Sequence, residues 1–431
     1  MLYIDKIPKQ LQSIIDVSAA QVSKPQAEWL QLLMMAMAVC LCQRNVKALA
    51  ALLDPDWARS SLNDFFTESP WVAPEVLRAA TLKALLDLGL RQGERIEVIL
   101  DGTPKAKWGL KMDALGWVKE AGTKEWRKGH RILLCYLRVR GVMFPWAVDL
   151  YLSEKFLKSE AGKALKDRLP DVHFRTLNEM AADMIRSLPA SWATDFNVTA
   201  LMDSGFCNPT ACGAVREMGF HYIVAAQSTR VLVKNTRKGE KGMTVVLQRF
   251  AAGRIRYQGR DVILPGKRRG SRSRCFRVAE TIGTLRGLGM VKVVCSRRES
   301  DGNILSLVSS DTEADARDVA LAYGWRWEIE VTTKGLKGRL GLGRYQCRYY
   351  EGMVHHLHLS LLAHLVLTVA ELQRRGQKAL KQRAAHQLPS IRVLQIRLRH
   401  EIWQGILAEL RPTCTDTRIL DRLERALEAA S

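Results

Sequence analysis

The sequence has few acidic residues for its number of basic ones, and its cysteines form no recognisable pairs. The 431 residues include 66 Lys and Arg but only 44 Asp and Glu, giving a formal charge of +22. Such a charge favours a polyanionic partner, most simply nucleic acid. The nine cysteines include no Cys-x2-Cys pair. They are therefore typical of reduced cytosolic thiols rather than of a zinc site or a disulfide framework.

Long hydrophobic runs are also absent. The longest apolar stretch, Leu32 to Cys42, is too short to cross a bilayer, and we expect it to be a buried helix. The first residues lack the basic-then-apolar order of a signal peptide, and no lipidation motif is present. We therefore expect a cytoplasmic protein with no membrane partner.

The most informative segment of the chain runs from Tyr323 to Lys337 and reads as one helix. At about 100° per residue, Tyr323 and Lys337 lie about 20° from the direction of Glu330, and Arg326 about 40° from it. A carboxylate, two cations and a phenol therefore share one narrow stripe. This combination is typical of a metal ligand flanked by groups that hold phosphate.

Two glutamates compete for the central role in this stripe. Glu328 lies about 160° from Glu330 around the helix and points away from the stripe. If the stripe is the functional face, Glu330 is the ligand. The alternative is a solvated helix face with ordinary salt bridges, which are common on helices.

The spacing Tyr-x2-Arg-x3-Glu-x6-Lys resembles the signature of bacterial insertion-sequence DDE transposases, the insertion-sequence-four-like group. The resemblance implies two further aspartates upstream, each at the end of an apolar strand. Asp101 follows the apolar run 95–100 and precedes Gly-Thr-Pro, and Asp203 follows the run 196–202 and precedes Ser-Gly. The family's first and second aspartates map onto these positions. An Asp beside Gly is, taken alone, more often a turn residue, and Asp113 and Asp149 compete with the two.

Phosphodiester cleavage places negative charge on phosphorus and on the leaving oxygen, and hard cations with oxygen ligands stabilise both. Three carboxylates hold two Mg²⁺ in such sites, and Mn²⁺ is able to substitute. The resemblance implies that Asp101 bridges both ions and that Asp203 and Glu330 each complete one site. It also implies DNA contacts, which we assign to Tyr323, Arg326, Lys334, Lys337, Lys107, Lys267, Arg268, Arg269, Arg272 and Arg274.

The predicted fold is α/β, with an RNase H-like, retroviral integrase-type mixed sheet, a β-rich insertion between the second Asp and the Glu, and helical ends. Residues 227–300 contain 19 Lys and Arg against four Asp and Glu, which favours a phosphate-gripping surface over a disordered basic loop. The predicted division is a helical N-terminal region (1–92), a catalytic core in two parts (93–226 and 306–372), a basic β-rich insertion (227–305) and a helical C-terminal region (373–431).

These features predict a DDE transposase that binds the terminal inverted repeats of its own element, cleaves DNA with Mg²⁺ and joins the ends to double-stranded target DNA. The expected assembly is a homodimer or a higher synaptic complex, in the bacterial cytoplasm on the nucleoid. Two alternatives remain open: a domesticated or inactive DNA-binding relative, and an RNase H-like, structure-selective DNA endonuclease without joining activity.

Overall fold

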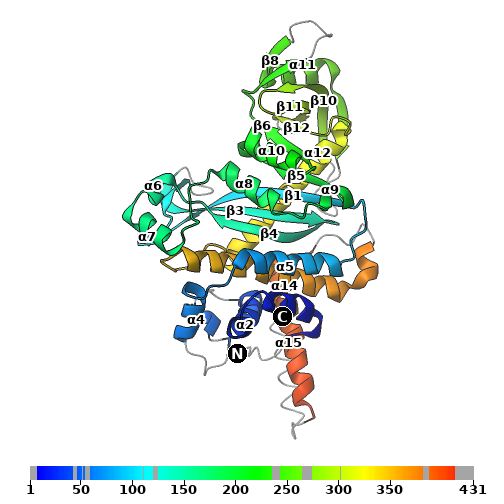
Figure 1. Cartoon of the computed structure of the whole chain (residues 1–431). Helices are drawn as coiled ribbons and strands as arrows, with labels where there is room; N and C mark the ends of the chain where they lie inside the picture. The colour runs from blue at the N-terminus through cyan, green and yellow to red at the C-terminus, as the bar shows by residue number, and fades with distance from the viewer. Residues whose placement is uncertain are drawn as a thin grey trace. The chain divides into compact units, whose positions relative to one another are not determined.

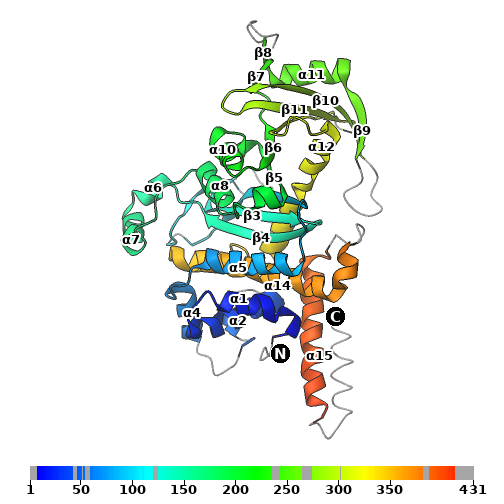
Figure 2. The ribbon, with the colours of Figure 1, turned by 45° about the vertical axis from the view of Figure 1, so that its right-hand side comes forward.

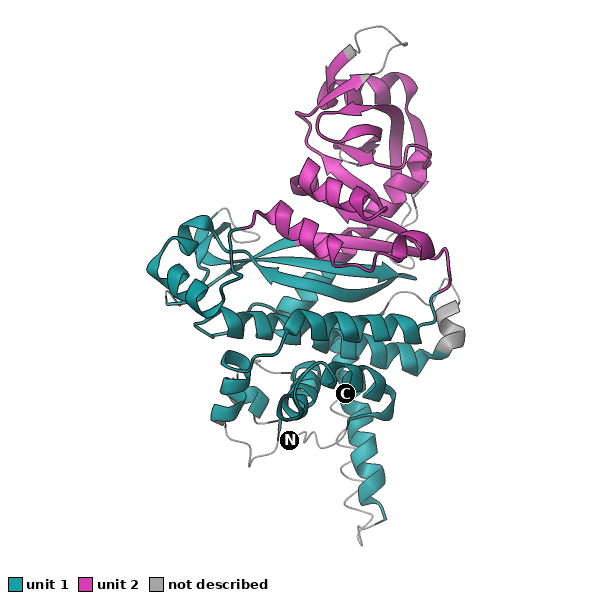
Figure 3. Cartoon of the chain, in the orientation of Figure 1, with its two compact units in different colours: residues 1–90, 102–174, 331–431 teal, residues 91–101, 175–330 magenta. Residues whose placement is uncertain are grey.

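The computed structural model describes residues 7–41, 46–50, 52–53, 59–109, 111–119, 125–234, 243–264, 274–300, 302–381 and 388–412. The chain forms two compact units (Figure 3). Unit 1 contains residues 1–90, 102–174 and 331–431, and unit 2 contains residues 91–101 and 175–330. The chain passes from one unit to the other inside strand β1 (Arg95–Ala106) and inside helix α13 (Trp327–Gly335).

Unit 1 is built in layers of a small antiparallel sheet and two layers of helices (Figures 1 and 2). Its sheet contains the second half of β1 with β2 (Gly116–Lys119), β3 (Trp126–Val139) and β4 (Val142–Leu150), in the order β2-β3-β1, with β4 also on β3. Helices α5 (Ala73–Asp87) and α14 (Tyr350–Lys381) cover β4. The other elements of unit 1 are η1 (Lys9–Leu11), α1 (Gln12–Ala19), α2 (Lys24–Val39), α3 (Val46–Ala50), α4 (Arg59–Thr67), α6 (Glu154–Leu157), α7 (Glu160–Arg168), the π-helical turn η3 (Leu336–Leu340) and α15 (Ile391–Leu410).

The hairpin of β3 and β4 has the register that its turn dictates. Arg140 and Gly141 have φ angles of 50° and 79°, and two positive φ angles in succession define the turn whose twist matches antiparallel strands. Val139 pairs with Val142 across this turn. The Arg-Gly pair therefore fixes the register of the hairpin.

Helix α14 forms the core of unit 1. Its segment Tyr350–Gly376 is, among the described residues, long and apolar enough to cross a membrane, but 94% of its most apolar stretch is buried within the protein. The helix packs against α2, α4 and α5 as well as β4. The apolar stretch from Leu357 to Leu372 is therefore part of the core of unit 1.

Unit 2 contains a mixed sheet in the order β1-β5-β6-β12-β11-β10-β7-β8, with β9 also on β10. Its first three strands are parallel, and β6, β12, β11 and β10 pair antiparallel. The strands after β1 are β5 (Asn197–Met202), β6 (His221–Ala226), β7 (Val231–Lys234), β8 (Met243–Val246), β9 (Arg260–Leu264), β10 (Arg274–Leu285), β11 (Gly289–Arg298) and β12 (Ile304–Ser309). The helices are α8 (Leu177–Arg186), α9 (Trp192–Asp195), η2 (Ser204–Phe206), α10 (Pro209–Glu217), α11 (Leu247–Gln258) and α12 (Ala316–Trp325).

Two expectations need correction. Tyr323 to Lys337 is not one helix, because α12 ends at Trp325, α13 begins at Trp327, and the π-helical turn η3 contains Lys337. Arg326 keeps a helical conformation at the junction, with φ −50° and ψ −34°, so the chain direction changes little there. The basic stretch from Gly253 onward is also not simply β-like, since α11 occupies its first part. The helix predicted over 416–430 lies outside the described residues.

Candidate active site

Two parallel strands of unit 2 place Asp101 and Asp203 at equivalent positions. The register of β1 and β5 pairs Arg95 with Asn197 and Ile99 with Leu201. Asp101 and Asp203 each follow two residues later, and neighbouring strands lie about 4.8 Å apart. Since side chains alternate along a strand, the two carboxylates leave the sheet on the same face. The runs before them, buried from Ile96 to Leu100 and from Ala200 to Met202, anchor both positions. Asp203 follows the end of β5, as expected, but β1 continues past Asp101 to Ala106, so the expectation that Asp101 ends its strand is wrong.

Asp203 is held by the turn that follows β5. Its carboxylate oxygen Oδ1 accepts a hydrogen bond from the Gly205 backbone N–H at 2.8 Å. A Cβ atom at position 205 would lie 3.1 Å from that oxygen, so glycine allows the close approach. The Ser-Gly sequence after Asp203 thus fixes the orientation of the carboxylate.

Arg326 links the other two carboxylates. Its Nη2 donates to Glu330 Oε1 at 2.5 Å, and its Nη1 lies 3.6 Å from Asp101 Oδ1. The side chains of Arg326 and Asp101 are each 15% exposed and that of Glu330 is 32% exposed, so water screens the pairs only partly. An ion pair between Arg326 and Glu330 is what the alternative of a salt-bridged helix face predicts, and the assignment of Arg326 to DNA stays a prediction.

Tyr323 forms one wall of the same group. Burial raises the pKa of its phenol, the nearby Arg326 lowers it, and the negative charges of Asp203 and Glu330 raise it. All four side chains are therefore close enough to influence one another electrostatically. The guanidinium carbon of Arg326 lies 5.8 Å from the Tyr323 ring centroid.

Lys337 has its partners within unit 1. Its ammonium donates to Thr103 Oγ1 at 2.5 Å and to the Pro104 carbonyl at 2.7 Å. Both partners belong to the part of β1 that directly follows Asp101 in the chain. Thr103 is a contact that sequence reasoning missed, although it lies in the Asp-Gly-Thr motif beside the first aspartate. Lys334, predicted to bind DNA, is exposed on α13.

Lys107 points inward. Its ammonium donates to the carbonyls of Gly343 and Tyr345 and lies 3.5 Å from the Tyr345 ring centroid. Burial and the charge of Lys105 lower the pKa of Lys107 to about 7. These contacts favour a structural role over the predicted DNA contact. Of the basic cluster after β9, Lys267, Arg268, Arg269 and Arg272 lie outside the described residues, and only the backbone of Arg274, at the start of β10, is described.

The donor set suits a hard divalent cation. Asp101, Asp203 and Glu330 provide only carboxylate oxygens, which Mg²⁺ and Mn²⁺ prefer. The guanidinium of Arg326 lies between Asp101 and Glu330 and pairs with both. These two carboxylates therefore already share one positive charge. In the described part of the chain, no three His, Cys, Asp or Glu residues are close enough to enclose an ion as they stand. Metal binding would therefore require Arg326 to withdraw and the carboxylates to close in.

Comparison with protein families gives two matches. The family described as DDE superfamily endonuclease matches residues 19–255, more than half of the chain, and the family described as transposase DDE domain matches residues 175–366. No curated protein matches the sequence. Among solved structures, the cryo-EM structure of a piggyBac transposase synaptic complex with hairpin DNA matches at 9% identity and a TM-score of 0.39. That match covers 97% of this chain and 83% of that chain.

The family matches bear on the predicted fold. DDE transposase domains imply an RNase H-like fold, and the predicted mixed α/β sheet is confirmed by the strand pairings. The strands that bear Asp101 and Asp203 are adjacent, and they are parallel. The description of residues 227–305 as an insertion into this fold, and the five-part division of the chain, stay predictions.

Proposed function

Because the chain belongs to the DDE superfamily endonucleases and contains a transposase DDE domain, we propose that it is the transposase of a bacterial insertion sequence of the insertion-sequence-four-like group. It would act in the cytoplasm on the nucleoid, bind the terminal inverted repeats of its element, cleave the DNA there and join the ends to target DNA. Two ends must be cut and joined together, so we expect a homodimer or a higher synaptic complex.

The observation that supports this most strongly is the gathering of three carboxylates in unit 2. Asp101 lies within β1, Asp203 follows the neighbouring parallel strand β5, and Arg326 joins Asp101 to Glu330. These three residues would hold two Mg²⁺ ions, or Mn²⁺ in their place, with Asp101 shared between the two. When bound, such ions activate the attacking water or 3′-hydroxyl and stabilise the leaving oxygen.

The remaining residues would position the DNA and the carboxylates. Arg326, released from Asp101 and Glu330, becomes available to a phosphate beside the scissile bond, where its planar fork fits two oxygens. Tyr323 keeps one side of the group dry, since its ring is largely buried. Lys337 holds the chain just beyond Asp101 through Thr103 and Pro104, and this contact fixes the end of β1.

The test is a cleavage and joining reaction. Purified protein is incubated with Mg²⁺ and labelled linear DNA that contains the flanking ends of its own gene. The wild type and Glu328→Gln should release the ends and form joined products, while Asp101→Asn and Glu330→Gln should form neither. Glu328 is the matched control, because it lies on the same helix as Glu330 and points away from the stripe.

Other outcomes would change the conclusion. Cutting without joined products would instead support an endonuclease without strand transfer. DNA binding without cutting by any of the four proteins, with Mg²⁺ and with Mn²⁺, would contradict the enzymatic proposal and favour a DNA-binding relative.

A further inference from the structure

The hairpin of β2 and β3 presents large aromatic side chains to solvent. Trp117 and Trp126 are 61% and 59% exposed, and Trp108, which precedes β2, is 86% exposed. Indole rings are usually well buried, and exposed ones concentrate at binding surfaces. None of these three tryptophans is a candidate for the cleavage chemistry. Their exposure therefore indicates a surface that binds a ligand without taking part in the cleavage chemistry.

The same hairpin interleaves these rings with cations. Trp117 pairs with Lys128 and Lys119 pairs with Trp126 across the two strands, so all four side chains share one face. The Lys128 ammonium lies 4.8 Å from the Trp117 ring centroid. Arg127 pairs with Val118 and therefore leaves the opposite face of the hairpin, where its guanidinium lies 5.2 Å from the Trp108 ring. Alternating indole rings and positive charges suit a ligand that alternates flat rings with negative charges.

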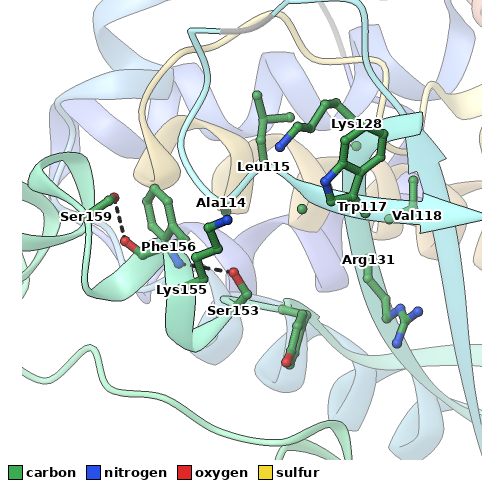
Figure 4. A pocket seen from close by; sticks show the side chains of 13 residues that line it. Ala114, Leu115, Trp117, Val118, Lys128, Arg131, Ser153, Lys155, Phe156 and Ser159 are labelled. Carbon is green, nitrogen blue, oxygen red and sulfur yellow. Dashed lines mark hydrogen bonds between the residues drawn. The ribbon is translucent and has the colours of Figure 1, made fainter. Parts of the chain in front are cut away.

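A pocket of about 450 Å³ adjoins this face and has the same chemistry (Figure 4). Trp117, Tyr151 and Phe156 supply aromatic rings to its lining, and Lys128, Arg131 and Lys155 supply positive charges. None of the described residues that line it is Asp or Glu. Its volume lies in the range of pockets that enclose small ligands, and a nucleotide is a ligand of this size. The lining therefore fits a base against aromatic rings with a phosphate against the cations.

We propose that the β2–β3 hairpin face and this pocket bind single-stranded DNA, with bases stacked on the indole rings and phosphates held by the lysines and arginines. The inference rests on the proposed function in one respect, that the polymer is DNA. In a duplex the base faces are stacked on one another and unavailable to an indole, whereas unpaired nucleotides offer them. Unpaired strands arise wherever DNA ends are cut and opened, so a cleavage reaction supplies the ligand that this surface would hold.

The experiment measures the fluorescence anisotropy of a labelled oligothymidine on titration with the full-length protein. Thymidine runs form little structure of their own, so binding reports stacking and charge. Trp117→Ala should weaken binding roughly 10-fold or more, since each stacked base contributes substantially to such complexes. Trp117→Phe keeps an aromatic face and should recover most of the affinity. Lys128→Gln should make binding less sensitive to salt, because one phosphate contact is removed.

Leu86→Ala is the control. Leu86 is 75% exposed on α5 of unit 1 and belongs neither to the hairpin nor to the lining of the pocket. It should leave oligothymidine binding unchanged. Equal weakening by Trp117→Ala and Leu86→Ala, or no weakening by Trp117→Ala in a protein with wild-type thermal stability, would overturn the inference.

A second titration with duplex DNA from the element ends separates this inference from the proposed function. Wild-type binding to the duplex with no binding to oligothymidine would overturn only the single-strand surface. Loss of both kinds of binding in the wild type would contradict both proposals. Binding of oligothymidine that is insensitive to all hairpin variants would leave DNA binding intact and assign the hairpin face to a protein partner instead.

Discussion

Arg326 neutralises part of the negative charge at the candidate active site. Its guanidinium contacts Asp101 and Glu330, and the charge of the nearby Asp203 helps to raise the pKa of Tyr323. Carboxylates grouped in this way repel one another unless a cation lies among them. Arg326 therefore acts as an internal counter-ion that a divalent metal would have to displace.

Replacing Arg326 by Gln should have opposite effects with and without metal. In a chelator, the variant should unfold more easily than the wild type, by about 1–3 kcal/mol, because the hydrogen-bonded Glu330 and the ion-paired Asp101 both lose their cation. Added Mn²⁺ should then raise its unfolding temperature more than that of the wild type. Thermal unfolding in chelator and in Mn²⁺ measures both effects. Equal stability of the two proteins in chelator would show that Arg326 does not compensate this charge.

For single residues, the sequence predicted those that a local pattern indicates. It did not predict contacts between segments that lie far apart in the chain. Asp101 and Asp203 were predicted from the family resemblance and the apolar run before each, and Arg326 and Glu330 from their spacing of one helical turn; the structure brings Asp101, Arg326 and Glu330 together. Thr103 and the inward orientation of Lys107 were missed. Their partners, Lys337 and the backbone of Gly343 and Tyr345, lie more than 200 residues away in the chain, and no spacing rule predicts that encounter.

Among the helices, a buried glutamate joins α14 to α15. The carboxylate of Glu371 is 2% exposed and accepts hydrogen bonds from Arg374 and Arg375 of its own helix and from Arg397 of α15. Burial raises the pKa of Glu371, but the hydrogen bonds from the three arginines outweigh it and hold this pKa at about 2. The acid thus remains charged and ties the two helices together.

Glu371→Gln should destabilise unit 1 by about 2 kcal/mol, because three guanidinium groups lose their shared partner. The loss is limited because two of these groups remain partly solvated. Chemical denaturation at neutral pH provides the measurement. Glu154→Gln, which removes an exposed carboxylate paired with Lys158, is the control and should leave the midpoint unchanged. An equal midpoint for Glu371→Gln and the wild type would contradict the assigned role.

The turn of the β3–β4 hairpin offers a second test at this scale. Gly141 has a φ angle of 79°, a region that residues with a Cβ adopt only at a cost. Gly141→Ala should therefore lower the free energy of unfolding by about 1–2 kcal/mol. Gly253→Ala on α11 is the control, because a Cβ at this position would meet open space. Gly102 also has open space but adjoins Asp101, so it is not used. A cost no larger at Gly141 than at Gly253 would contradict the turn assignment.

Helix and strand patterns were predicted well where the sequence gives a capping or turn signal. The helix after Thr176 begins with a capping box formed by Thr176 and Glu179, and the β3–β4 turn has its Arg-Gly pair. Helix α11 was missed because Gly253 and several arginines obscure it. Its buried residues Leu247, Phe250, Ala251 and Ile255 are nonetheless spaced three, four and eight residues from the first, which is the helical signal that was available.

Over the whole molecule, buried neutral histidines make stability depend on pH. Burial lowers the pKa of His130, His358 and His364 to about 4, against a usual value near 6.5. Between these values the unfolded chain binds protons that the folded protein does not. Stability should therefore be complete above about pH 6.5 and should fall as the pH drops towards 4, by about 3 kcal/mol for each histidine.

Chemical denaturation from pH 7 to pH 4 measures this loss. His364→Gln should make the decline shallower, because one of the titrating groups is gone. His173→Gln replaces an exposed histidine and should leave the decline as it is in the wild type. A stability that stays level over this range would contradict the assignment of these histidines as neutral core residues.

The central claim is that Asp101, Asp203 and Glu330 form one divalent-metal site. The most direct test is calorimetric titration of metal-free protein with Mn²⁺ for the wild type, the three single amide variants of these residues and Glu328→Gln. We expect the wild type and Glu328→Gln to bind Mn²⁺ alike. Asp101→Asn, Asp203→Asn and Glu330→Gln should each lose most of that binding. Undiminished Mn²⁺ binding by all three variants would contradict it.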